Sequence, residues 1–222
     1  MSDLSEHEIS IDSKFSGKSL ILFGAKHIPG SMVLLVKGPG TDYTIQKKKK
    51  FMGIWVSGKQ VIFHDVPSYY MVAHTEDLAG LGDSQLLKNL QIGVDNVDLE
   101  TDSVLNIQEE EEFKTALKSY LVDHKLIQDF PGEGFGFIDE SLFRIPLYFP
   151  DTITRGTYTA ELYLFDEGRL LAIQSTPLVV NRQGAEAFIF DFAHEYSYSY
   201  GIIAVVLALF CGGIANILFK KK

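Results

Sequence analysis

One apolar stretch near the C-terminus constrains this 222-residue chain more than any other feature. Residues 201–219 read GIIAVVLALFCGGIANILF and carry no formal charge. A helix of that length extends about 28 Å at ~1.5 Å per residue, close to the roughly 30 Å hydrocarbon core of a bilayer. The alternative, a buried C-terminal helix of a soluble domain, fits poorly with a span that has no polar face and ends in lysines. We therefore expect one transmembrane helix over residues 201–219.

Residues that favour membrane boundaries flank this span on both sides. Tyrosines precede it, where amphipathic rings favour the interface, and three lysines follow it. Because positive flanking residues stay in the cytoplasm, we expect a periplasmic N-terminal domain in the cell inner membrane, a juxtamembrane segment over 191–200 and a cytoplasmic tail over 220–222. The expected interface residues are Tyr196, Tyr198, Tyr200, Lys220, Lys221 and Lys222.

The first residues do not resemble the signal that export requires. The sequence MSDLSE has neither a basic region nor an apolar one. Two interpretations stay open: a signal was removed before Met1, or the protein is tail-anchored and faces the cytoplasm.

Charge and cysteine content exclude several classes of protein. The net charge is −9, and it is −12 without the three terminal lysines. A body this acidic is poorly suited to bind a nucleic-acid backbone, which requires a basic face. The single cysteine, Cys211, excludes a disulfide framework and any multi-cysteine metal site.

Short apolar segments separated by turn residues predict the fold of the soluble part. The pair 157–165 and 169–174 flanks Asp166-Glu167-Gly168, a turn with glycine available for positive φ. We predict a mainly β fold, an immunoglobulin-like antiparallel β-sandwich, with Trp55 packed between its sheets. The other expected strands are 19–25, 32–37, 54–56 with 61–63 on either side of a turn at Ser57-Gly58, and 69–74.

A helical insert over about residues 76–132 is expected to interrupt the sandwich. Apolar residues recur at helical spacing between Glu109 and Lys125, and the acidic run Glu109–Glu112 suits the positive end of the helix dipole. The insert has no separate core of its own, so residues 1–190 are expected to form one exported domain. The stripe consists of Phe113, Ala116, Leu117, Tyr120, Leu121 and His124.

The order of several short motifs resembles the Alph_Pro_TM family of transmembrane proteins of alphaproteobacteria, over nearly the whole chain. Members usually begin with a signal peptide, from which this sequence departs. The family implies no established activity, but its genes are often described near permeases of the sulfite or organosulfonate exporter type, which implies an accessory role beside such a transporter. The motifs are LSEHEI at 4–9, GIWV at 53–56, PSYY at 67–70, GVDN at 93–96, GTYTAELYLF at 156–165, STPL at 175–178 and DFAHE at 191–195.

We predict no catalytic, metal or cofactor site. The six histidines are scattered, and the chain has no HExxH, GxSxG or P-loop pattern. If the membrane helix begins early, Asp191, His194 and Glu195 fall on one face and could dock a partner at the membrane surface. An interfacial helix start that keeps polar groups wet is the simpler alternative.

Small residues follow one face of the expected span and predict a helix partner. Alanine and glycine at four-residue spacing let a second helix approach closely, although the pattern can arise by chance. A polar asparagine within an apolar span usually faces protein. The partner would be a second copy or another membrane protein. The predicted packing residues are Gly201, Ala204, Ala208, Gly212 and Asn216.

One basic run lies in the soluble part, at Lys47, Lys48, Lys49 and Lys50. It would contact anionic headgroups or an anionic ligand, or else guard a solvated strand edge. Together these features favour a non-enzymatic, membrane-anchored periplasmic accessory protein that docks on a membrane partner. The alternative is a β-sandwich that binds a small ligand and presents it to a transporter.

Overall fold

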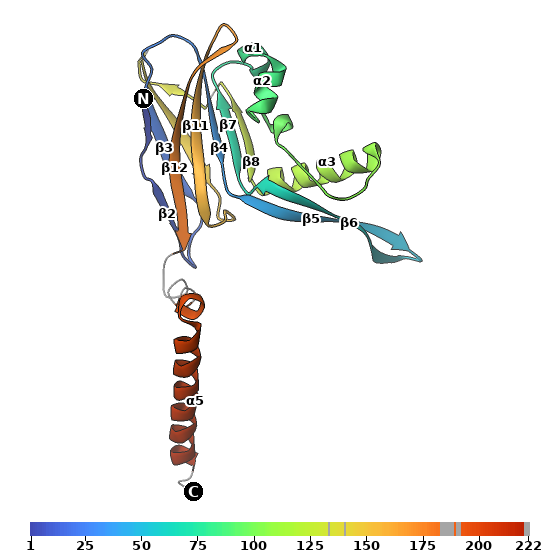
Figure 1. Cartoon of the computed structure of the whole chain (residues 1–222), viewed down its shortest axis with the longest axis vertical. Helices are drawn as coiled ribbons and strands as arrows, with labels where there is room; N and C mark the ends of the chain where they lie inside the picture. Colours follow the sequence, from blue (N-terminus) through green and yellow to red (C-terminus); the bar gives the residue numbers. More distant parts are fainter. Residues whose placement is uncertain (133, 140, 183–188, 190–191, 220–222) are drawn as a thin grey trace. The chain divides into compact units, whose positions relative to one another are not determined.

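The computed structural model describes residues 1–132, 134–139, 141–182, 189 and 192–219 (Figure 1). It divides into two compact units. The first unit comprises residues 1–9 and 14–181 and holds the β-sheets. The described residues of the second unit are 10–13, 182, 189 and 192–219, and they include the C-terminal helix.

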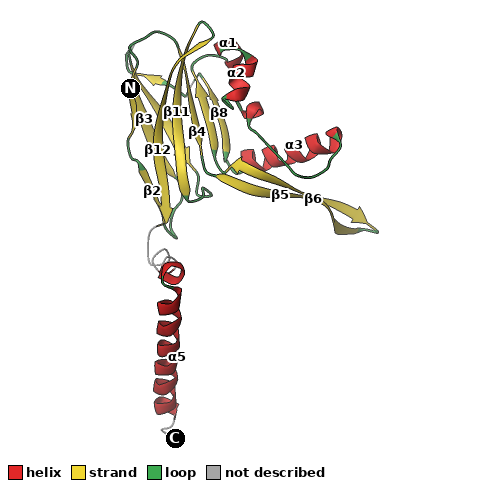
Figure 2. Ribbon diagram, viewed as in Figure 1, coloured by secondary structure: helices red, strands yellow, loops and turns green. Residues whose placement is uncertain are grey.

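Two sheets form the framework of the first unit, as Figure 2 shows. The four-stranded sheet has the order β1-β3-β10-β9, from Ser2–Leu4, Lys18–Ala25, Leu142–Phe149 and Gly136–Phe137. The six-stranded sheet has the order β2-β12-β11-β4-β7-β8, from Glu8–Ile11, Arg169–Arg182, Gly156–Asp166, Ser31–Lys37, Tyr70–His74 and Ile127–Pro131. The predicted mainly β class is confirmed, and the immunoglobulin-like arrangement stays a prediction.

Aromatic side chains fill the space between the two sheets. The Tyr69 ring stacks on Phe149 with centroids 5.0 Å apart, and Phe149 meets Tyr158 edge-on at 5.9 Å. All three side chains are fully buried. The Tyr69 hydroxyl donates to the Tyr148 carbonyl at 2.7 Å, so its polar end is satisfied within the core. This part of the sandwich interior is therefore filled by the chain's own side chains, while a cavity of about 270 Å³ lies between the sheets beside Phe143 and Leu164.

The segment between β7 and β8 is helical, as predicted. It contains α1 (Leu78–Leu81), α2 (Ser84–Asn89), the 3-10 turn η1 (Val94–Asn96) and α3 (Ile107–Asp123), of which only α3 was predicted individually. The side chain of Asn106 caps α3 by accepting from the Glu109 amide at 2.8 Å. The segment ends in β8, which pairs with β7 in parallel. A parallel pair requires a long crossover connection, and the helical insert supplies it. Strand β8 itself was not predicted.

The insert shares a hydrophobic core with the six-stranded sheet. Phe113, Leu117 and Leu121 of α3 are buried in one cluster with Val33 and Leu35 of β4. Both faces of β4 are thus covered, which explains its continuous run of buried residues. The remaining stripe positions are more exposed: Ala116, Tyr120 and His124.

A long β-hairpin extends from this core. Strands β5 (Gly40–Phe51) and β6 (Ile54–Pro67) pair antiparallel as a two-stranded sheet. The prediction of two short strands, 54–56 and 61–63, with a turn at Ser57-Gly58 was wrong. The chain continues through these residues, because Gly58 lies at a register shift opposite Lys47, where a Cβ would approach the Lys47 carbonyl oxygen to 2.5 Å.

Candidate functional site

The C-terminal helix is the first candidate interaction element. Helix α5 spans Ser197–Phe219 and so begins four residues before the predicted span. Within the described residues it is the one helix long and apolar enough to cross a membrane, and its window from Ser197 to Ile214 has no buried residue. A helix that is apolar on all sides and unburied favours lipid as its surroundings.

The predicted packing face lies along this helix. Gly201, Ala204, Ala208 and Gly212 are all exposed. A Cβ added at Gly201 or Gly212 would meet no atom within 4 Å, so nothing described in this chain occupies the space beside these glycines. Asn216 is helical, but its side chain lies outside the described residues.

The juxtamembrane residues continue the helix toward the N-terminus. Residues 192–195 are helical, and the Tyr200 amide donates to the Tyr196 carbonyl at 2.9 Å. The Phe192 ring stacks on Tyr196 with centroids 5.8 Å apart. His194 and Glu195 are exposed at this level, as are Tyr196, Tyr198 and Tyr200. Asp191, Lys220, Lys221 and Lys222 lie outside the described residues, so the proposed acidic and basic ends stay predictions.

The second candidate is the end of the β5–β6 hairpin. Lys47, Lys48, Lys49 and Lys50 all lie on β5 and are exposed. The strand is held near its middle by ion pairs to α3: Lys47 Nζ lies 2.6 Å from Glu112 Oε2, and Lys59 Nζ of β6 lies 2.9 Å from Glu109 Oε2. A hydrogen bond to Glu112 raises the pKa of Lys47, and the one from Lys59 lowers the pKa of Glu109.

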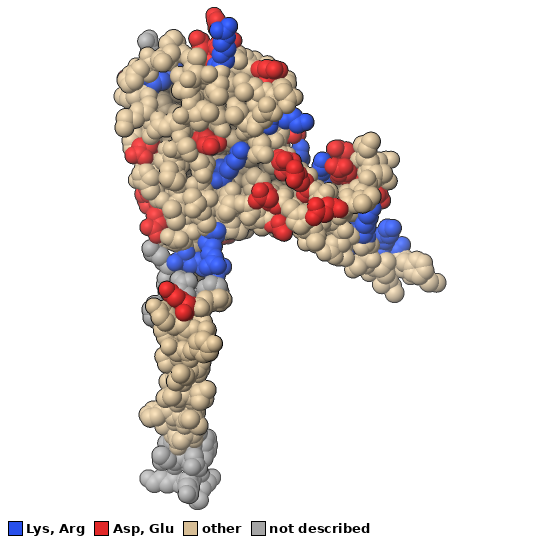
Figure 3. All heavy atoms as spheres, in the orientation of Figure 1, with Lys and Arg blue, Asp and Glu red and all other residues tan. Residues whose placement is uncertain are grey.

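The prediction that Trp55 packs between the sheets was wrong, because Trp55 lies at this end of the hairpin. Its side chain is 66% exposed. Figure 3 shows the end of the hairpin as a surface without charge and the basic side chains just behind it. The expectation was wrong because hydrophobicity alone does not separate a core position from an apolar tip. A signal was present in the uninterrupted apolar run FMGIWV, in which no polar residue marks the turn.

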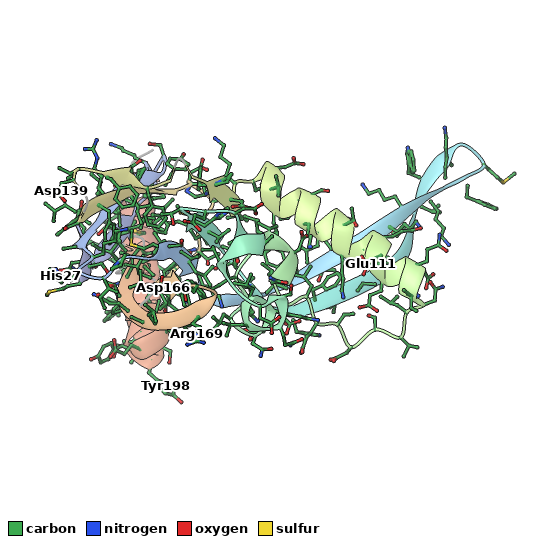
Figure 4. All side chains as sticks on the ribbon, turned by 90° about the horizontal axis from the view of Figure 1, so that it is seen from above. His27, Glu111, Asp139, Asp166, Arg169 and Tyr198 are labelled. Carbon is green, nitrogen blue, oxygen red and sulfur yellow. The ribbon has the colours of Figure 1, made fainter. Side chains whose placement is uncertain are left out.

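Two polar clefts adjoin the helical insert, one within it and one between it and strands β4, β5 and β6. The larger, about 410 Å³, lies between the α2–η1 region and α3, which carries the labelled Glu111 in Figure 4. Lys88, Lys114 and Lys118 line it together with acidic residues. A smaller one of about 280 Å³ shares Gln91 and Asp98 with it. Among the described residues, no group of three or more His, Cys, Asp and Glu side chains could hold a metal ion.

The comparison with protein families agrees with the membrane helix. A family model described as "Putative transmembrane protein (Alph_Pro_TM)" matches residues 1–221. The chain belongs to this family. The resemblance drawn from the sequence is thereby confirmed, as is the chain's membership of a family of membrane proteins. No curated protein and no solved structure matches the chain.

Proposed function

We propose that this Alph_Pro_TM protein is a non-enzymatic accessory protein of the inner membrane that docks on a membrane-protein partner through α5. The observation that carries the proposal is the row Gly201, Ala204, Ala208 and Gly212 with open space beside its glycines. Lipid tails fill such a row less closely than a second helix does, because small residues let two backbones approach. The partner is a polytopic protein, for which an exporter-type permease is our candidate.

The packed aromatic rings support this assignment over a ligand-carrying one. Around Tyr69, Phe149 and Tyr158 the space between the sheets is filled, so a small molecule there would have to displace aromatic side chains. In this proposal the soluble unit provides an interaction surface that α5 anchors at the membrane. Glu195 before the helix and the three lysines after it support a periplasmic location for this unit.

Affinity purification in mild detergent tests the docking. The tagged full chain is expected to bring down a polytopic protein, and Ala208→Leu with Gly212→Leu is expected to abolish its recovery, because two larger side chains block close approach. Val206→Leu, on the opposite face of the helix, is the matched control and is expected to retain the partner. Recovery of the chain alone, or equal recovery with both variants, contradicts the proposal. Recovery of a second copy alone replaces it with a homo-oligomer.

The larger cleft favours a second candidate, the binding of a small zwitterion. Its lining combines three lysines with Asp95, Asp98 and Glu111, so both ends of such a ligand would find an opposite charge. The Lys118 ammonium already lies 3.0 Å from Asp95. Titration calorimetry of the full chain with taurine, an aminosulfonate, tests this candidate. Saturable heat that Lys114→Ala abolishes would support it, and the absence of heat would reject taurine-like ligands.

A further inference from the structure

The turn of the β5–β6 hairpin has an unusual residue at its first position. Met52 and Gly53 form the two-residue turn with φ of +49° and +86°. Two positive φ values identify a type I′ turn, for which asparagine and glycine are preferred. Methionine has no polar side chain to offset the left-handed conformation. Turn formation alone therefore does not explain why a large apolar residue stands here, 89% exposed.

All apolar side chains around this turn are exposed to solvent. The same strands are amphipathic at their base, where Val61 and Phe63 are buried against the insert. Beyond Ile45 the strands are no longer divided into a buried and an exposed face, and their large hydrophobic side chains pack into no core. The exposed fractions are 65% for Phe51, 89% for Met52, 69% for Ile54, 66% for Trp55 and 41% for Val56.

Each face of the hairpin end carries a large aromatic side chain, which points to lipid rather than protein as the occupant. Phe51 pairs with Ile54 on one face, and Trp55 pairs with Lys50 on the other. One rung farther back, Lys49 lies opposite Val56, so lysines stand behind apolar groups on both faces. Figure 4 shows side chains projecting from both sides of this end. A hairpin that packs on a protein needs one apolar face, whereas a bilayer surrounds a tip from all sides.

The lysines nearest the tip are available to anionic headgroups. The ion pairs of Lys47 and Lys59 with α3 hold the stem, and no ion pair joins Lys48, Lys49 or Lys50 to another residue in the described part of the chain. Aromatic and aliphatic residues in front of lysines are the pattern of a segment that enters the interfacial region of a bilayer. The bilayer surface is itself negative where anionic lipids are present.

We propose that residues 51–56 insert into the interfacial region of the bilayer that anchors this chain, with Lys48, Lys49 and Lys50 binding its anionic headgroups. Because α5 tethers the hairpin to a membrane, even modest partitioning is favoured by a high effective concentration. The insertion needs no protein partner, so its test stands apart from that of helix docking.

The only tryptophan of the chain, Trp55, reports on this insertion directly. The purified full chain is reconstituted into vesicles with and without phosphatidylglycerol, and Trp55 emission is quenched either by iodide in water or by brominated acyl chains. With phosphatidylglycerol we expect a blue-shifted emission, protection from iodide and quenching by the brominated lipid. Each lysine should contribute about a fivefold factor to the ratio of inserted to free tips, so Lys48→Gln/Lys49→Gln/Lys50→Gln should lower it about a hundredfold.

A matched control moves the probe to the base of the hairpin. In Trp55→Phe/Thr44→Trp the tryptophan stands at an exposed position of β5 near the stem, and it should remain open to iodide in both kinds of vesicle. Trp55 that stays quenched by iodide in phosphatidylglycerol vesicles would overturn the proposal. Equal protection in both vesicle types, unchanged by the triple variant, would overturn the role of the lysines. Protection that requires a co-purified protein would replace the lipid by a protein partner.

Discussion

Two aromatic residues on the same strand, Phe63 and Trp55 of β6, should differ sharply in what they contribute to stability. Phe63 is fully buried with Val61 and Leu117, whereas Trp55 is 66% exposed. A buried aromatic side chain removes about 150–250 Å² from water, which at ~25 cal/mol per Å² gives an upper bound of about 4–6 kcal/mol. We therefore expect Phe63→Ala to lower the free energy of unfolding by about 3–5 kcal/mol. Trp55→Ala should change it by no more than about 0.5 kcal/mol.

Urea unfolding of the full chain in mild detergent, followed by far-ultraviolet circular dichroism, measures both variants on one scale. The α5 helix stays in the micelle and contributes a constant signal, so the transition reports on the β-rich unit. Ile62→Ala, between these positions in sequence and partly exposed, serves as a control with an intermediate loss. A loss above about 2 kcal/mol for Trp55→Ala would refute the reasoning, because it would place the indole in a packed core.

Three further outcomes follow from the structure. Tyr69→Phe removes the hydroxyl that donates to the Tyr148 carbonyl, and should lower the free energy of unfolding in urea by about 1–2 kcal/mol. Lys59→Gln should lower the unfolding midpoint near neutral pH; because the hydrogen bond lowers the pKa of Glu109, this difference should vanish as the pH falls through that pKa. A cysteine at Asp102, in a Cys211→Ala background, should react with a membrane-impermeant maleimide in intact spheroplasts if the body is periplasmic; labelling only after lysis would reverse the orientation.

The elements predicted correctly are those with a strong local signal. The hairpin of β11 and β12 follows from alternating apolar residues on either side of Asp166-Glu167-Gly168, and the observed strands contain both predicted ones. The membrane helix follows from a charge-free run whose length matches a bilayer. In both cases the pattern depends on neighbouring residues alone.

The elements that were not predicted depend on contacts distant in sequence. Strand β10 alternates buried and exposed residues, but it contains Pro146, which argues against a strand. The proline is tolerated because β9 pairs only with Phe143 and Arg144, leaving that edge of β10 open farther along. Strand β8 exists because the insert returns beside β7, which no local pattern indicates.

The candidate site divides in the same way. The packing row from Gly201 to Gly212 was readable because helical periodicity is local, and the structure places it on one exposed helix. The exposed apolar tip around Trp55 could not be predicted from the sequence, because its exposure depends on how far β5 and β6 extend beyond α3. The lysine run did draw attention to this segment. Whether it contacts anionic groups or guards a strand edge could be judged only from the position of the hairpin end in the fold.

A cysteine crosslinking scan along α5 tests the central claim most directly. Single cysteines at positions 201–216, in a Cys211→Ala background and in native membranes, should crosslink to a partner with helical periodicity. We predict maxima at positions 204, 208 and 212 and a minimum at 206 and 210 on the opposite face. A uniformly low profile would contradict the account, because α5 would then be a lipid-facing anchor without a partner helix.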